Sequence, residues 1–234
     1  PAPPSAMAQN TEDMKNTAAI SVVDGALASD EMAVSGGAIT GNTARPGGGV
    51  YAQDDASVRL HGGRITGNTA SESGGGVRFA KAVFRLRGDP VVHGNTLSDG
   101  TASNVYAADP DQLRITVDGA LSDDALLGVT VSAAPASGTP IILTTGLSGN
   151  GTAESFVSDD SRLVIGANAD GEAILALPVT LRFDGGDGGS GDMESITAAS
   201  GGQVVLPSCD FTPADGGEFD GWRIGGETYA PGDA

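Results

Sequence analysis

Acidic side chains make up most of the groups in this sequence that could do chemistry. Two neighbouring carboxylates can act as general acid and general base, and Asp54 and Asp55 are adjacent. Asp99 and Asp109 lie in segments rich in turn-forming residues. We interpret Asp54 and Asp55 as solvated charge in a loop, because they align with Lys81 and Ala82 rather than with further acids about one repeat later. We place Asp99 and Asp109 in turns.

Histidine and cysteine are scarce. His61 and His93 are the only histidines, and they lie 32 residues apart (93 minus 61), which matches neither a metal-binding pair nor a Ser-His-Asp arrangement. Cys209 is the only cysteine, so no disulfide can form within the chain and no thiolate cage can hold a metal. We expect Cys209 to be buried and inert.

A glycine-rich loop near the end of the chain holds the best candidates for binding a cation. Asp184, Asp187 and Asp192 are spaced acids that could place oxygen ligands around Ca²⁺. The match to a calcium-binding loop is loose, and the family resemblance of this segment, given below, implies a turn at Asp184 and the glycines instead. Trp222 and Tyr229 could stack on a sugar ring, but we expect them in a small core. We therefore assign no catalytic, cofactor-binding or metal-binding residue.

Composition and charge exclude several classes of protein. The 234 residues include 37 Gly and only 4% aromatic residues, a bias typical of turn-rich β and repeat architectures. The net charge of −18 would repel nucleic acid and anionic lipid, so we expect neither as a partner. No apolar run reaches the roughly 18 residues of a membrane span, and the first residues lack the features of a secretion signal. We therefore expect no membrane insertion and an internal fragment of a longer protein.

An internal repeat provides the framework that positions the side chains of this chain. GGAITGNTA at 36–44 recurs as GGRITGNTA at 62–70, a shift of 26 residues (62 minus 36), and more weakly as GDPVVHGNT at 88–96. A short alternating strand precedes each copy, and a valine-containing strand follows it. A period of this length, with several short strands and glycine corners, predicts one coil of a parallel β-helix.

Stacking the copies predicts the interior. Ile39, Ile65 and Val92 should form one inward apolar column, and a second should follow on the next strand, formed by Val50, Val77 and Val105. Asn42, Asn68 and Asn95 follow glycines at a bend, where a residue that tolerates a positive φ is favoured. We interpret these asparagines as a structural ladder of stacked amides rather than a ligand site.

The same alignment tests for an enzyme. Parallel β-helices also carry polysaccharide lyases and hydrolases, which set carboxylates on neighbouring coils. Here the register positions hold Ala38, Arg64 and Val91, and Asp54 and Asp55 are replaced by Lys81 and Ala82 one coil later. No column of carboxylates is predicted.

The repeat stops after Tyr106, and we divide the chain into three parts. Residues 1–110 should form the β-helix, with 18–23 belonging to an earlier coil. Residues 111–178 contain β-like runs without the repeat and should form a β-rich cap over the open end. Residues 179–234 reset the pattern and should form a separate module.

This last module resembles the Listeria/Bacteroides repeat, also called the internalin-type B-repeat. The residues that carry the resemblance are Val179, Phe183, Asp184, Gly185, Gly186, Gly191, Met193, Leu206, Pro207, Phe211, Phe219, Gly221, Trp222, Tyr229 and Gly232. The resemblance implies a small β-grasp-like domain with an adhesive or spacing role on bacterial surface proteins. The chain departs from the family in holding one copy and a longer, more acidic glycine loop.

The β-helix part is similar to the polymorphic outer-membrane-protein-like repeats of bacterial adhesins. Their Gly-Gly-x-Ile motif is matched at 36–39 and 62–65, although their Phe-x-x-Asn companion is missing. The resulting fold class is all-β: a right-handed parallel β-helix, a β-rich cap and a β-grasp-like domain. We expect a non-enzymatic, extracellular, cell-surface-attached fragment that acts in adhesion or as a display stalk. Its partner would be a host surface protein or a glycan, and the chain would continue into further surface modules. The alternative is a carbohydrate-active β-helix protein whose catalytic coils lie outside this chain.

Overall fold

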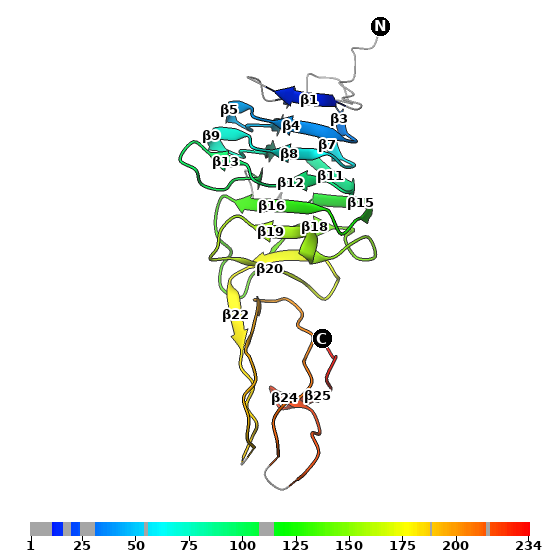
Figure 1. Cartoon of the computed structure of the whole chain (residues 1–234), viewed down its shortest axis with the longest axis vertical. Helices are drawn as coiled ribbons and strands as arrows, with labels where there is room; N and C mark the ends of the chain where they lie inside the picture. Colours follow the sequence, from blue (N-terminus) through cyan, green and yellow to red (C-terminus); the bar gives the residue numbers. More distant parts are fainter. Residues whose placement is uncertain are drawn as a thin grey trace.

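Parallel strands stack on one another along the long axis of the molecule, and a narrower C-terminal part follows them (Figure 1). The structure is a computed structural model, and it describes residues 11–15, 20–23, 31–53, 56–107, 115–187, 189–213 and 216–234. The stack is a parallel β-solenoid of about four turns over residues 32–158. This confirms the parallel β-helix predicted from the repeat.

Each of the first complete coils contributes four short strands, one to each side of the solenoid. The first side stacks β3 (Glu31–Val34), β7 (Ser57–Leu60), β11 (Val83–Gly88), β15 (Ile115–Leu121) and β18 (Thr144–Thr145). The second side stacks β1 (Thr11–Lys15), β4 (Gly37–Thr40), β8 (Arg64–Thr66) and β12 (Val91–Val92). Neighbouring strands on each side are parallel, as stacking of equivalent segments requires.

The other two sides complete the coil. The third side stacks β5 (Thr43–Pro46), β9 (Thr69–Ser73) and β13 (Thr96–Leu97). The fourth side stacks β2 (Ile20–Val23), β6 (Val50–Gln53), β10 (Val77–Ala80) and β14 (Val105–Ala107). The strand β2 lies within the segment 18–23 that we expected to join an earlier coil, and it pairs in parallel with β6.

The predicted apolar columns are confirmed. Ile39 pairs with Ile65 and Ile65 with Val92, and all three side chains are buried. On the fourth side, Val77 pairs with Val50 on one edge and with Val105 on the other, and these side chains are fully buried. A further inward column on the first side contains Val34, Leu60, Leu86 and Val117. These columns form one continuous apolar core.

The parallel pairing extends beyond residue 110, where we placed the end of the β-helix. One longer strand, β16 (Leu126–Val131), pairs with β12 through its first residues and with β14 through its last. The next strand in the stack, β19 (Phe156–Ser158), pairs with β16. Here a single strand replaces the strand, bend and strand of the earlier coils, which explains why the sequence repeat is lost while the stacking continues.

Antiparallel structure follows the last parallel strand. The strands β17 (Ile141–Ile142), β21 (Ala173–Ala176) and β20 (Val164–Ala167) form one small sheet, and a single 3-10 turn, η2, covers Ala153–Ser155. Leu163, Ala173 and Leu175 belong to the solenoid core, so this sheet packs on the end of the stack.

The C-terminal part consists of two small antiparallel pairs. The strand β22 (Pro178–Leu181) pairs with β23 (Ile196–Ala199), and β24 (Trp222–Ile224) pairs with β25 (Glu227–Tyr229). Ala199 of β23 is buried together with Ile174. The backbone N–H of Gln203 donates to the backbone carbonyl of Ala167 at 2.8 Å. Contacts of this kind attach the C-terminal part to the antiparallel sheet above it.

No helix in the part of the chain that the structure describes is long and apolar enough to cross a membrane.

Candidate functional site

The three repeated asparagines form the predicted ladder of amides inside the solenoid. Asn42 donates both its backbone N–H and its side-chain Nδ2 to Oδ1 of Asn68, each at 3.0 Å. Asn68 makes the same pair of bonds to Oδ1 of Asn95, at 3.1 and 3.0 Å. All three residues are buried, so each side chain satisfies polar groups that have no access to water.

Two further residues continue this ladder, and the sequence analysis missed both. Asn95 donates through its backbone N–H and Nδ2 to Oδ1 of Asn104, at 2.8 and 3.0 Å. Asn104 in turn donates to Asp159, from Nδ2 to Oδ1 at 2.6 Å and from the backbone N–H to Oδ2 at 2.7 Å. The ladder therefore points one way along the solenoid and ends on a carboxylate, which offers acceptors only.

The register explains how Asn104 joins the ladder. Val50, Val77 and Val105 are in register, so the residues before them, Gly49, Gly76 and Asn104, occupy equivalent positions. A Cβ on Gly76 would lie 2.7 Å from Nδ2 of Asn95, so this position must be glycine where an asparagine of the ladder lies beside it. The fourth coil has no asparagine bend of its own, and Asn104 supplies the missing rung. The signal in the sequence was the change from Gly-Gly-Gly-Val to Ala-Ser-Asn-Val.

One detail of the predicted bend is wrong. We expected the asparagines to be favoured because they tolerate a positive φ. In the structure the positive φ falls on the preceding glycines, 70° at Gly41, 66° at Gly67 and 73° at Gly94, and no asparagine in the described residues has one. Asparagine is required there for its amide, which bonds to the next coil, and glycine is required for the turn.

The candidate acids do not come together. Asp54, Asp55 and Asp109 lie outside the described residues. Asp99 accepts a hydrogen bond from the backbone N–H of Thr101 at 2.9 Å, and this bond and that of the Thr101 hydroxyl lower the pKa of Asp99. It therefore caps a turn, as expected of a loop acid.

The register positions that would hold catalytic acids carry other residues. Ala38 pairs with Arg64 and Arg64 with Val91, as the alignment of the copies predicted. His61 follows β7 and His93 follows β12, on different sides of the solenoid. Within the ranges that the structure describes, no three His, Cys, Asp or Glu side chains lie close enough together to hold a metal ion.

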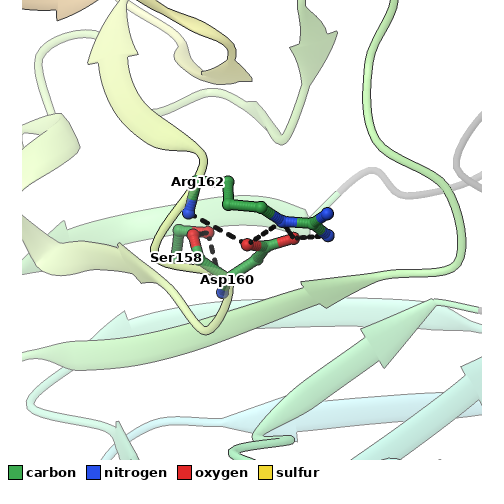
Figure 2. Close-up of polar contacts among 3 residues, drawn as sticks. All are labelled: Ser158, Asp160 and Arg162. Atoms are coloured by element: carbon green, nitrogen blue, oxygen red, sulfur yellow. Dashed lines mark hydrogen bonds and ion pairs between the residues drawn. The ribbon is translucent and has the colours of Figure 1, made fainter.

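A tight turn follows the last parallel strand and places Asp159. Figure 2 shows its three side chains: the hydroxyl of Ser158 donates to the carbonyl of Asp160 at 2.9 Å, and the Asp160 carboxylate faces Arg162. Arg162 donates to Asp160 through Nε at 3.0 Å, through Nη2 at 2.7 Å and through its backbone N–H at 2.9 Å. The guanidinium first, and then the backbone N–H, lower the pKa of Asp160 to about 2.

Glu172, like Asp159, is an acid whose carboxylate accepts several hydrogen bonds from another segment of the chain. Its carboxylate accepts hydrogen bonds from the Thr144 hydroxyl at 2.7 Å and from the backbone N–H groups of Gly146 and Leu147 at 2.8 and 3.1 Å. These three partners of the carboxylate belong to β18 and the turn after it. Glu172 therefore ties the antiparallel sheet to the solenoid.

The acidic glycine loop contains a local turn. Oδ1 of Asp184 accepts a hydrogen bond from the backbone N–H of Gly186 at 2.9 Å, the bond of an Asx-turn. Cys209 is half-buried, which corrects the expectation of a buried thiol. The Tyr229 hydroxyl donates to the Glu227 carboxylate at 2.9 Å, and this contact raises the pKa of Tyr229.

Trp222 is the centre of the small C-terminal core, as expected. Three phenylalanine rings surround it, at centroid distances of 4.8 Å for Phe183, 4.9 Å for Phe219 and 6.4 Å for Phe211. The indole Nε1 donates to the carbonyl of Pro207 at 2.9 Å. An open cavity of about 750 Å³ adjoins these rings, so the aromatic cluster is only partly covered.

A tyrosine column lies on the outer face of the fourth side of the solenoid. It consists of Tyr51, Arg78 and Tyr106, which are in register on β6, β10 and β14. Each alternates with buried valine, alanine or phenylalanine neighbours and is itself half-buried, so the three side chains face outward. The Arg78 guanidinium carbon lies 5.2 Å from the centre of the Tyr51 ring, a cation–π contact. We call this set the tyrosine column.

Comparisons with known proteins give no relative: no family model, no curated protein and no solved structure matches the chain.

Proposed function

We propose that this chain is a non-enzymatic fragment of a bacterial cell-surface protein that acts in adhesion or display. The observation that supports this best is the in-register stacking of a solenoid whose buried asparagine side chains bond from coil to coil and end on Asp159. Such a stack is a rigid support for side chains repeated at about 4.8 Å on its outer faces. Extended, repeated surfaces suit the recognition of another large molecule.

The finer features of this proposal rest on the resemblances in the sequence. They comprise a right-handed β-helix similar to polymorphic outer-membrane-protein repeats, and a C-terminal β-grasp-like B-repeat module. The aromatic cluster around Trp222 contains residues that carry the second resemblance. On this proposal the fragment is extracellular, is attached to the cell surface, continues into further surface modules and binds a host surface protein or a glycan. Nucleic acid and membrane insertion have no part in the proposed role.

A carbohydrate-active protein is the alternative. Polysaccharide lyases and hydrolases use the same architecture, and their acids could lie on coils outside this chain. Within the described coils, the register positions hold alanine, arginine, valine and threonine. These residues favour recognition over bond cleavage in this part of the solenoid.

One experiment separates the two functions. The protein is incubated with a panel of acidic and neutral polysaccharides, and reducing ends and unsaturated ends are measured over time. We expect no release of new ends, together with retention of the protein on at least one immobilised glycan or matrix protein. Clear turnover would overthrow the adhesion proposal. Absence of both turnover and binding would rule out adhesion and favour the display stalk.

A further inference from the structure

We propose that the tyrosine column binds an acidic polysaccharide, with Arg78 pairing an acidic group and the tyrosine rings stacking on the flanking sugars. This inference rests on the proposed adhesive function and names its ligand class.

The first argument is the state of Arg78. Its Nε is buried and has no hydrogen-bond partner among the described residues. Its one assigned contact is with the Tyr51 ring. Two other arginines on the surface each have a carboxylate partner: Arg45 lies 2.6 Å from Glu72, and Arg162 lies 2.7 Å from Asp160. A guanidinium held against a ring without a carboxylate partner can bind an acidic group from outside through its two terminal Nη groups, in the fork geometry that arginine favours.

The second argument is the distribution of charge. Residues 45–87 contain seven Lys and Arg against three Asp and Glu, a net charge of +4, although the whole chain carries −18. The remaining residues therefore carry −22 (−18 minus 4). Arg78 lies inside this basic segment, and the exposed Lys81 follows on the same coil. The coils that carry Tyr51 and Arg78 thus have a positive net charge within an acidic chain, which favours an anionic ligand on this part of the solenoid.

The third argument selects a glycan among anions. Tyr51 and Tyr106 flank Arg78 on the neighbouring coils, so two aromatic rings lie one on each side of the cation. Tyrosine presents both an apolar ring face and a polar hydroxyl, as sugar recognition requires. Double-stranded nucleic acid, with one charge per roughly 1.7 Å, would meet the strong negative charge of the rest of the molecule. A polysaccharide with at most one carboxylate on each sugar has a lower charge density than duplex DNA and is repelled less by that charge.

The end of the column limits the site. The next residue in register after Tyr106 is Thr130, whose hydroxyl donates to Oδ2 of Asp159 at 2.5 Å. The carboxylate at this end opposes a further acidic group. The proposed site therefore extends from Tyr51 to Tyr106, with one carboxylate of the ligand paired to Arg78 and the sugars on either side stacked on the tyrosine rings.

The test measures binding of the whole chain to polygalacturonate, neutral dextran and double-stranded DNA by isothermal titration calorimetry. Salt is set at about 0.15 M, where a Debye length of about 8 Å screens the distant acids. We expect binding to polygalacturonate only. The substitution Arg78→Gln should weaken it by roughly tenfold or more, since a charge-assisted hydrogen bond is lost. Tyr106→Leu should weaken it by about fivefold through loss of ring stacking.

The matched control is Arg162→Gln, which removes one positive charge from an exposed site outside the column and should leave binding unchanged. Circular dichroism checks that each variant is folded. Equal weakening by Arg78→Gln and Arg162→Gln would overturn the proposal, because binding would then follow net charge. Stronger binding to DNA than to polygalacturonate would also overturn it. If polygalacturonate fails to bind but the protein adheres to a matrix protein or a neutral glycan, the ligand assignment is wrong and the adhesive function stands.

Discussion

The side-chain amide of Asn104 donates to Oδ1 of Asp159 at 2.6 Å, although 55 residues separate them in the chain. This contact joins the last rung of the asparagine ladder to the turn after the last parallel strand. Asp159 also accepts the Asn104 backbone N–H at 2.7 Å and the Thr130 hydroxyl at 2.5 Å. Three donors therefore converge on one carboxylate, and the direction of every amide in the ladder is compatible with that arrangement.

The substitution Asp159→Asn should destabilise the solenoid. It replaces one of two acceptor oxygens with an NH₂ group that must face a donor, so at least one hydrogen bond is lost and a partly buried donor is left unsatisfied. The expected loss is about 1–3 kcal/mol in the free energy of unfolding. Urea unfolding followed by circular dichroism measures it. Asp170→Asn is the control, because Asp170 is exposed and its carboxylate lies outside the ladder. Equal stability of the two variants would contradict the role given to Asp159.

A neighbouring glycine leaves room for this contact. A Cβ added to Gly128 would lie 2.3 Å from Nδ2 of Asn104 and 2.6 Å from Oδ1 of Asp159. Neither side chain can move without breaking hydrogen bonds, so Gly128→Ala should cost about 2 kcal/mol or more in unfolding free energy. Gly217→Ala is the matched control, since nothing lies within 4 Å of its added Cβ. A Gly128→Ala protein as stable as this control would show that the two side chains are not held in place.

The sequence predicted the coils whose residues recur at a fixed spacing. Ile39 and Ile65 occupy the same position in two nearly identical segments. Because equivalent segments stack on neighbouring coils of a β-helix, the alignment of the two segments predicts that these residues pair. The Asn42–Asn68 rung followed for the same reason. Where copies align, the inward columns and the residues that share an outward register position can both be predicted.

The rest could not be predicted from the repeat, because the structure continues where the repeat does not. In the fourth coil one strand, β16, serves two sides of the solenoid. Its sequence therefore lacks the bend that marked earlier coils, and we assigned it to a cap. No earlier coil repeats the sequence around Asp159, so no alignment of copies could bring it to Asn104. The tyrosine column needed the register of the fourth side, where the residues differ in type between coils.

Removing the Trp222 ring should unfold the C-terminal part and leave the solenoid intact. The substitution Trp222→Ala removes the ring that contacts Phe183, Phe211 and Phe219, at an expected local cost of about 3–5 kcal/mol. Hydrogen exchange should then lose protection in β24 and β25 while β10 and β14 keep it. Trp222→Phe is the milder comparison, since it retains a ring but loses the bond to the Pro207 carbonyl. Loss of protection throughout the chain would contradict the separate core proposed here.

The pKa of Asp160 can be measured directly. Arg162 lowers it from 3.8 to about 2, so the folded protein binds this proton more weakly than the unfolded chain does. The contact therefore contributes stability above about pH 4 and loses that contribution as the pH falls toward 2. A carboxyl ¹³C titration of the folded protein should give a midpoint near 2 for Asp160.

The variant Arg162→Gln should move that midpoint back toward 3.8, since the guanidinium bonds are the largest cause of the shift. The return should be partial, because the backbone N–H of residue 162 still donates to the carboxylate at 2.9 Å. Arg223→Gln, which removes an exposed charge beside Asp220, should leave the Asp160 midpoint in place. An Asp160 midpoint near 3.8 in the unmodified protein would show that the contact in Figure 2 is not formed in solution.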